Sequence, residues 1–100
     1  MRLNSQQFST GSQSPLVVLH GLFGAQDNWR SQVLVWAQDR HVITMDLRNH
    51  GMSAHDVLMD YPSMAADVIE SMDAMGLDKV DLLGHSMGGK AAIQLALNHP

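Results

Sequence analysis

A serine between glycines carries the most specific chemistry in this sequence. Ser86 is the central residue of Gly84-His85-Ser86-Met87-Gly88, between an apolar run that predicts a strand and a stretch that predicts a helix. Glycine two residues to either side of a serine permits a tight turn, because a Cβ there would collide with neighbouring backbone. Such a turn presents the serine Oγ as a nucleophile, and the N–H of Met87 can then bind the oxyanion of an attacked carbonyl.

The same stretch has a second interpretation, as a phosphate-binding loop. Gly84, Gly89 and Lys90 match the P-loop pattern up to its last position, which should be Ser or Thr because that hydroxyl holds magnesium. Ala91 occupies that position instead, so nucleotide binding is the weaker alternative. We expect Lys90 to be solvated on the first turn of the helix.

A second glycine-bearing loop, His20-Gly21-Leu22-Phe23-Gly24, follows the first predicted strand. In a serine hydrolase on a parallel sheet, the second oxyanion N–H comes from this loop. The donor is Leu22 or Phe23, and the sequence does not decide between them. Both side chains would also form apolar walls for an acyl group. We expect His20, at a strand end, to make a structural hydrogen bond rather than to act as the base.

A third polar segment, Asp46-Leu47-Arg48-Asn49-His50-Gly51-Met52-Ser53, caps the next predicted strand. We expect Asp46 and Arg48 to brace the loops around the nucleophile, which is a structural rather than a catalytic role. His50 and His55 share this loop, but no histidine pair has the helical i, i+4 spacing with a carboxylate that marks a metal site. The sequence therefore predicts no metal ligands.

Regular elements must position these loops. Short β-branched and aliphatic runs predict strands, and apolar residues at helical spacing predict helices. The expected strands cover 2–8 (a weak edge), 16–19, 41–47 and 79–84, and the expected helices start near 27–28, 61 and 87. The alternation predicts parallel strands with right-handed crossovers. Ligands on such sheets bind at the carboxyl ends of the strands, where all three glycine-bearing loops begin.

The helix over 61–75 has clear boundary signals. Asp60 is a suitable N-cap, Pro62 falls in the first turn, and Gly76 follows the end. For the helix before it, Asp27 or Asn28 is the expected N-cap. The apolar stripe of helix 61–75 consists of Met64, Ala65, Val68, Met72 and Met75, and its acidic residues, expected largely off that stripe, are Asp67, Glu70 and Asp73.

Composition narrows the class of protein. The 100 residues, 45% hydrophobic with a formal net charge of −4, suit one domain with a real core. The absence of cysteine excludes a disulfide framework, a zinc ribbon and a thiol nucleophile. The six Lys and Arg residues form no basic patch, so we expect no nucleic-acid partner. No run approaches the ~18–20 apolar residues of a membrane span, and the N-terminus lacks a signal-peptide core. The default location is cytoplasmic.

Together the motifs resemble the α/β-hydrolase superfamily. His20-Gly21, Asp46-x-Arg48-x-x-Gly51-x-Ser53 and Gly84-His85-Ser86-Met87-Gly88-Gly89 occur in its order and rough spacing. Arg48-Asn49-His50-Gly51, in place of the commoner Arg-Gly-x-Gly, is similar to YbfF-type bacterial esterases and their mitochondrial abhydrolase relatives. The resemblance covers the chain from about Pro15 onward. It implies the N-terminal part of a three-layer αβα fold, with a mostly parallel sheet and helices on both faces.

The resemblance also implies a reaction, the hydrolysis of a small-molecule acyl ester or acyl thioester without a metal or organic cofactor. Ser86 would be the nucleophile, and the N–H groups of Met87 and of Leu22 or Phe23 would form the oxyanion hole. Gly21, Gly84 and Gly88 would shape the loop and the turn.

The family places its catalytic acid and base after the serine. Beyond Ser86 this chain has no acidic residue and one histidine, His99. His99 stands at the far end of the predicted helix, roughly 20 Å away at 1.5 Å per residue, so it cannot reach Ser86. We therefore expect residues 1–100 to be a partial domain of a longer enzyme whose acid, base and cap lie beyond Pro100. The alternative is a fragment with no turnover of its own.

Overall fold

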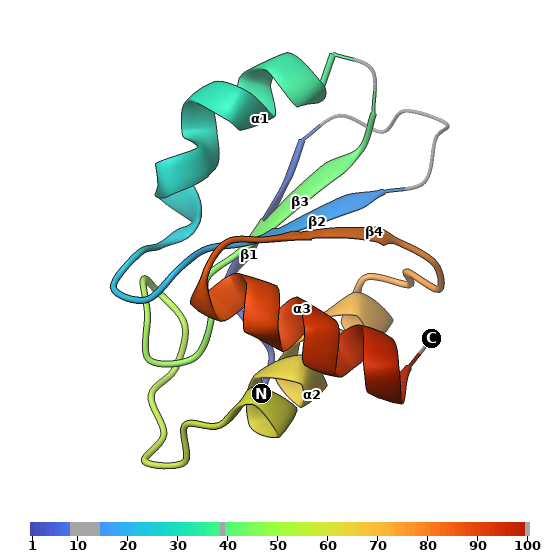
Figure 1. Ribbon diagram of the computed structural model, residues 1–100. Coiled ribbons are helices and arrows are strands. Elements are labelled where there is room, and N and C mark those ends of the chain that lie inside the picture. The colour runs from blue at the N-terminus through green and yellow to red at the C-terminus, as the bar shows by residue number, and fades with distance from the viewer. Residues whose placement is uncertain (9–14, 39, 100) are drawn as a thin grey trace.

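The computed structural model describes residues 1–8, 15–38 and 40–99, in which one sheet lies between two layers of helices (Figure 1). The residues Gly11-Ser12-Gln13-Ser14-Pro15 predict a turn, and all of them except Pro15 fall outside the described residues. The elements in chain order are β1 (Ser5–Phe8), β2 (Leu16–Leu19), the 3₁₀ helix η1 (Gln26–Trp29), α1 (Arg30–Trp36), β3 (Val42–Met45), α2 (Tyr61–Ala74), β4 (Asp81–Gly84) and α3 (Met87–Asn98).

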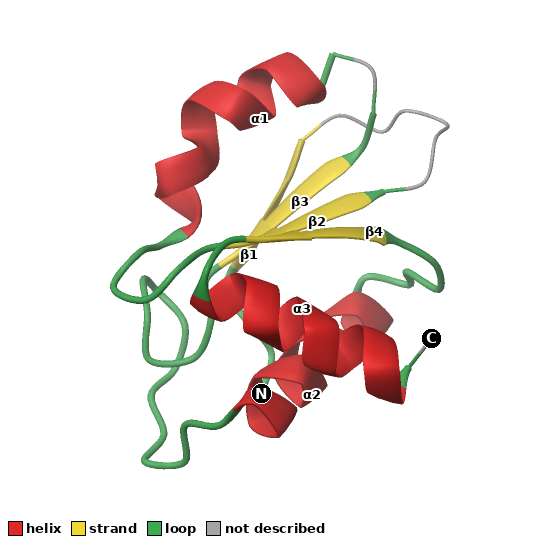
Figure 2. Ribbon diagram, in the orientation of Figure 1, coloured by secondary structure: helices red, strands yellow, loops and turns green. Residues whose placement is uncertain are grey.

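The sheet has the order β1-β3-β2-β4, with β2 parallel to both of its neighbours and β1 antiparallel to β3 (Figure 2). The predicted parallel strands and the weak edge strand are confirmed. Leu19 pairs with Met45 on one side and with Gly84 on the other, so the three parallel strands end level. The loops that follow them therefore leave from the same edge of the sheet, as we expected.

Alternate residues of the central strand face different helical layers. Val17 and Leu19 belong to the core beneath α2 and α3, whereas Val18 packs with Val33 of α1 on the opposite face. All four side chains are at most 1% exposed. A strand buried on both faces reads as a continuous apolar run, which explains the Leu-Val-Val-Leu sequence. Figure 1 shows α1 on one side of the sheet and α2 with α3 on the other, so the predicted three-layer arrangement is confirmed.

The start of α1 differs from the expectation. Asp27 and Asn28 are not its N-cap, because a 3₁₀ turn capped by Ala25 precedes the helix. Asn28 is the third residue of that turn, and its Oδ1 accepts the N–H of Ala25 at 2.8 Å. In a capping box, the side chain of the third helical residue accepts the N–H of the cap residue, and Asn28 makes this contact. Asn28 therefore supports the 3₁₀ turn from within it and is not the cap.

The boundaries of α2 are confirmed, but its polar face is not. Asp60 caps the helix by accepting the N–H of Ser63 at 2.7 Å, and Gly76 has the positive φ of 72° usual just past a helix end. Asp67 is 1% exposed, so its predicted place off the buried face was wrong. With 14 residues α2 is the longest helix of the described chain, and none there is long and apolar enough to cross a membrane.

Candidate active site

Ser86 forms a sharp turn between β4 and α3. Its backbone has φ 55° and ψ −112°, a conformation that L residues rarely adopt, and it is exposed at the end of the sheet. Neighbouring backbone can approach this turn closely only because Gly84 and Gly88 have no side chains. A Cβ on Gly84 would overlap the carbonyl of Gly88, and a Cβ on Gly88 would overlap the carbonyls of Leu19 and His20. Strain of this kind is held by the surrounding packing and clusters at functional sites.

The loop after β2 lies directly beside this serine. A Cβ on Gly21 would come within 3.4 Å of the Ser86 Cβ and 2.9 Å of the His85 Nδ1. The N–H of His85 donates to Leu19 O at 3.1 Å, which ties the serine turn to the end of β2. The His85 ring also packs edge-on against Trp29 at 6.1 Å. The structure therefore brings two of the predicted motifs together.

The available backbone donors distinguish Leu22 from Phe23. The N–H of Phe23 donates to the Nε2 of His50 at 3.1 Å. Within residues 1–8, 15–38 and 40–99, the N–H groups of Leu22 and Met87 have no hydrogen-bond acceptor. Sequence reasoning left Leu22 and Phe23 as equal candidates because the partner of Phe23 is 27 residues away.

Asp46 organises the segments around the site from a buried position. One carboxylate oxygen accepts the Gln26 N–H at 2.9 Å, and the other accepts from Asn4 at 2.8 Å, Met52 at 3.0 Å and the Gln26 amide at 3.1 Å. Burial raises the pKa of the Asp46 carboxyl, but these hydrogen bonds outweigh it and hold the pKa below its usual range. Gly51, at φ 52°, lies so close to this carboxylate that any Cβ would overlap it.

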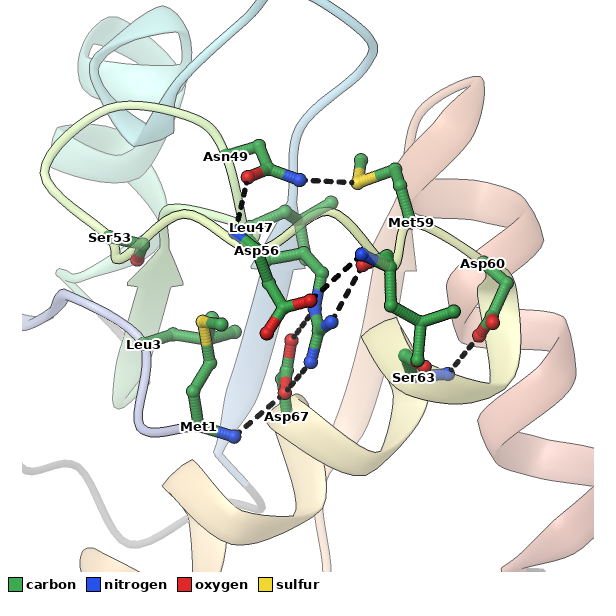
Figure 3. Close-up of polar contacts among 12 residues, drawn as sticks. Met1, Leu3, Leu47, Asn49, Ser53, Asp56, Met59, Asp60, Ser63 and Asp67 are labelled. Carbon is green, nitrogen blue, oxygen red and sulfur yellow. Dashed lines mark hydrogen bonds and ion pairs between the residues drawn. The ribbon is translucent and has the colours of Figure 1, made fainter.

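Arg48 joins the loop after β3 to α2 through a buried ion pair. Its Nε and Nη2 donate to the two carboxylate oxygens of Asp67 at 2.6 and 2.8 Å, and its Nη1 donates to Leu58 O at 2.8 Å. The α-amino group of Met1 also donates to Asp67, at 2.8 Å. Figure 3 shows the Asp67 carboxylate on α2 pointing toward the α-amino group of Met1. Arg48 thus contacts the scaffold and not Ser86.

His20 is engaged through both ring nitrogens. Its Nδ1 lies 2.7 Å from Gly21 O, and its Nε2 accepts the N–H of Leu47 at 3.0 Å. A carbonyl can only accept, so Nδ1 carries the proton and the ring is neutral. Burial lowers the pKa of His20, against the opposing effect of its bond to Gly21. His20 therefore has no free nitrogen with which to act as a base.

The sequence suggests no role for His50 beyond that of a metal ligand, which its spacing does not support, whereas the structure places His50 against the candidate oxyanion loop. Its Nδ1 lies 2.9 Å from Arg48 O while its Nε2 accepts from Phe23, and its ring centroid is 5.1 Å from that of His20. An open groove of about 460 Å³ adjoins these residues. Its lining consists of Leu22, Phe23, Gly24, Asn49, His50, Gly51 and Met59.

Other predicted chemistry is placed elsewhere. The Lys90 ammonium lies 5.9 Å from the ring centroid of Tyr61, over α2, and not at the loop where a P-loop would hold phosphate. His99 follows the last residue of α3, at the opposite end of the helix from Ser86. In the part of the chain that the structure describes, no group of three or more His, Cys, Asp or Glu side chains could hold a metal ion.

Comparisons with known proteins match this chain to one family. The sequence profile of the alpha/beta hydrolase fold family matches residues 14–100. Esterase YbfF of Escherichia coli (strain K12) is 43% identical over 98 residues, which cover 95% of this chain and 39% of that protein. The sn-1-specific diacylglycerol lipase ABHD11 of Xenopus tropicalis is 49% identical over 88 residues, covering 86% of this chain and 28% of the lipase.

A solved structure described as a marine microorganism esterase has the same fold. It matches with a TM-score of 0.94 and 40% identity, covering 99% of this chain and 38% of its own. The present chain thus spans less than two fifths of the length of each of these relatives.

We predict that Gly88→Ala prevents the serine turn from forming, because the added Cβ overlaps backbone carbonyls of Leu19 and His20. Gly89→Ala is the matched control. The nearest atom to its added Cβ is Gly84 O at 3.2 Å, and alanine stabilises a helix by up to ~1 kcal/mol relative to glycine. Urea denaturation should show a loss of about 2 kcal/mol or more for the first variant and within about 1 kcal/mol for the second. Equal losses would contradict this packing.

The Arg48–Asp67 ion pair predicts that substitutions of these two residues have non-additive effects on the free energy of unfolding. Arg48→Met leaves the buried Asp67 carboxylate with only the α-amino group of Met1, and Asp67→Leu removes the carboxylate that the Arg48 guanidinium contacts. Each variant should therefore cost about 3–5 kcal/mol of unfolding free energy. The double variant should lose at least about 1 kcal/mol less than the sum of the two, because it removes both charges. A urea-denaturation cycle over the four proteins measures this, and additive losses would argue against a direct pair.

Asp46 predicts an acid-dependent stability. Its pKa is lower in the folded than in the unfolded chain, so its contribution is complete above the unfolded value of about 4 and is lost as the pH falls through the folded value. Asp46→Asn should therefore be less stable than the parent at pH 7 but should lose less stability between pH 5 and pH 3. If the free energy of unfolding falls equally with pH in the two proteins, the acid-dependent loss of stability does not come from Asp46.

Proposed function

Because the chain belongs to the alpha/beta hydrolase fold family, with close similarity to the YbfF type, we propose that it supplies the nucleophile and oxyanion hole of a serine esterase. The substrates are carboxylic esters or acyl thioesters of small molecules. One observation carries this proposal. Ser86 is exposed at φ 55°, beside a loop in which the Leu22 N–H has no acceptor among the described residues. The names of the relatives, an esterase and a diacylglycerol lipase, support the same class of reaction.

The reaction that suits this site is a two-step acyl transfer to water. The Ser86 Oγ attacks the carbonyl carbon, its proton passes to a general base, and the negative charge that develops on the carbonyl oxygen is bound by the N–H groups of Leu22 and Met87. The tetrahedral adduct collapses, the base returns the proton to the departing alcohol or thiol, and the acyl group remains on Ser86. Water then releases the acid by the same steps.

Ser86 needs a base and an orienting acid to be an activated nucleophile. Among the described residues, no histidine or carboxylate makes a hydrogen bond to the Ser86 Oγ. His20 is fully hydrogen-bonded elsewhere, and His99 lies past the far end of α3. We infer that residues 1–100 form the N-terminal part of the catalytic domain, with the acid, the base and the cap beyond Pro100. The alternative is a fragment without turnover. The cytoplasmic location stays a prediction from the sequence.

The contacts around Lys90 weigh against the nucleotide-binding alternative. Its ammonium lies over Tyr61, and Ala91, at the position of the metal-holding hydroxyl, is fully buried. A magnesium nucleotide should therefore leave the melting temperature unchanged. A rise in melting temperature with magnesium–ATP would favour the alternative.

The encoding nucleic acid decides between enzyme and fragment. Sequencing past codon 100 should reveal an open frame that supplies an Asp or Glu after one more strand and a His near its end. A stop codon directly after codon 100 would leave Ser86 without a base and would favour the inactive fragment.

In that longer protein, a fluorophosphonate should label Ser86, as peptide mass spectrometry can show. Ser86→Ala should abolish labelling and reduce ester hydrolysis by a factor of about 10³ or more, because the covalent step is lost. Ser31→Ala, an exposed serine on α1, is the matched control and should behave as the parent. Labelling that persists in Ser86→Ala would contradict the assignment of the nucleophile.

A further inference from the structure

The turn that carries the candidate oxyanion donor is strained and poorly packed. Phe23 has φ 62°, a conformation that costs an L residue roughly 1–2 kcal/mol. It is the third residue of a turn closed by Gly24 N–H to Gly21 O at 3.0 Å, a position where glycine is usual when φ is positive. Its side chain is 91% exposed, so packing does not hold it in place. Hydrogen bonds must therefore maintain this shape.

Two consecutive peptide groups of this turn are fixed by two histidines. The Gly21–Leu22 peptide is held through its carbonyl oxygen, which accepts from His20 at 2.7 Å. Because the C=O and N–H of a trans peptide point in opposite directions, this contact aims the Leu22 N–H away from His20. The next peptide, Leu22–Phe23, is held through its N–H, which donates to His50 at 3.1 Å.

His50 is itself oriented by the loop after β3. Its Nδ1 lies 2.9 Å from Arg48 O, its backbone N–H donates to Leu47 O at 3.0 Å, and its backbone carbonyl accepts from Ser53 at 3.1 Å. Since Arg48 O can only accept, the proton is on Nδ1 and the lone pair on Nε2 faces Phe23. The neutral Nδ1–H tautomer is the form that makes both contacts.

We propose that His50 is a positioning residue, which fixes the Leu22–Phe23 peptide so that the N–H of Leu22 remains the oxyanion donor. This inference rests on the proposed esterase function. Without the contact to His50, the strained Phe23 can relax to negative φ and rotate the peptide, and its N–H then competes with that of Leu22. A donor displaced by about 1 Å at a site of this kind can cost up to 10²-fold in rate.

The test compares three variants of the longer protein that carries this chain, with a neutral p-nitrophenyl ester as substrate. His50→Leu removes the acceptor at similar volume and should lower kcat about 10- to 100-fold with KM changed by less than about threefold. His50→Gln provides an amide oxygen for the Phe23 N–H and should recover kcat to within about fivefold of the parent. His55→Leu is the control, because His55 is exposed in the same loop and makes no hydrogen bond to the described residues.

Ser86→Ala in the same assay separates this inference from the proposed function. Full activity in Ser86→Ala would overturn the function itself, whereas an inactive Ser86→Ala together with an unchanged kcat in His50→Leu would overturn only the role of His50. A fall in kcat that His50→Gln does not rescue would also overturn that role.

If His50→Leu does not fold, the tautomer of the His50 ring in the parent protein tests the proposal instead. Nitrogen-15 NMR of labelled histidine at pH 7.5 should show His50 protonated on Nδ1 and unprotonated on Nε2. A ring protonated on Nε2 cannot accept from Phe23 and would refute the proposal.

Discussion

The close approach of the start of α3 to the end of β2 is the constraint on which the site depends. Gly88 sits against the carbonyls of Leu19 and His20, and Gly84 sits against the carbonyl of Gly88, with no room for a side chain at either position. This contact forces Ser86 into a conformation that an isolated chain would avoid, and it sets the serine beside Gly21. The level ends of three parallel strands then bring the loops after β2 and β3 to the same edge.

Polar side chains, rather than apolar packing, give these loops their shape. Asp46 accepts four hydrogen bonds from three segments, and Arg48 forms an ion pair with Asp67 on α2. His20 and His50 each make hydrogen bonds to backbone groups of the segments that follow β2 and β3. A buried polar network stabilises one conformation only when its members are all satisfied, because an unpaired buried group costs more than a bond contributes. The strained backbone of Phe23, whose side chain is exposed, is held by the hydrogen bond from its N–H to His50 rather than by packing.

Sequence patterns predicted the parts of the structure that rest on local signals. The strands at 16–19 and near 41–47, the cap Asp60 and the turn around Ser86 are each encoded within a few neighbouring residues. Contacts between distant residues could not be predicted in this way. The burial of Asp67 depends on Arg48, 19 residues earlier, and the choice between Leu22 and Phe23 depends on His50. Periodicity places Asp67 on a helix face but cannot show that an arginine reaches it.

The most direct measurement is a crystal structure of the longer protein after reaction with a fluorophosphonate, whose phosphoryl oxygen takes the place of the carbonyl oxyanion. The phosphorus should be bonded to the Ser86 Oγ, and the phosphoryl oxygen should lie about 2.7–3.1 Å from the backbone nitrogens of Leu22 and Met87. The N–H of Phe23 should still donate its hydrogen bond to the Nε2 of His50. Phosphorus on a different residue, or a phosphoryl oxygen bound by neither amide, would contradict the account.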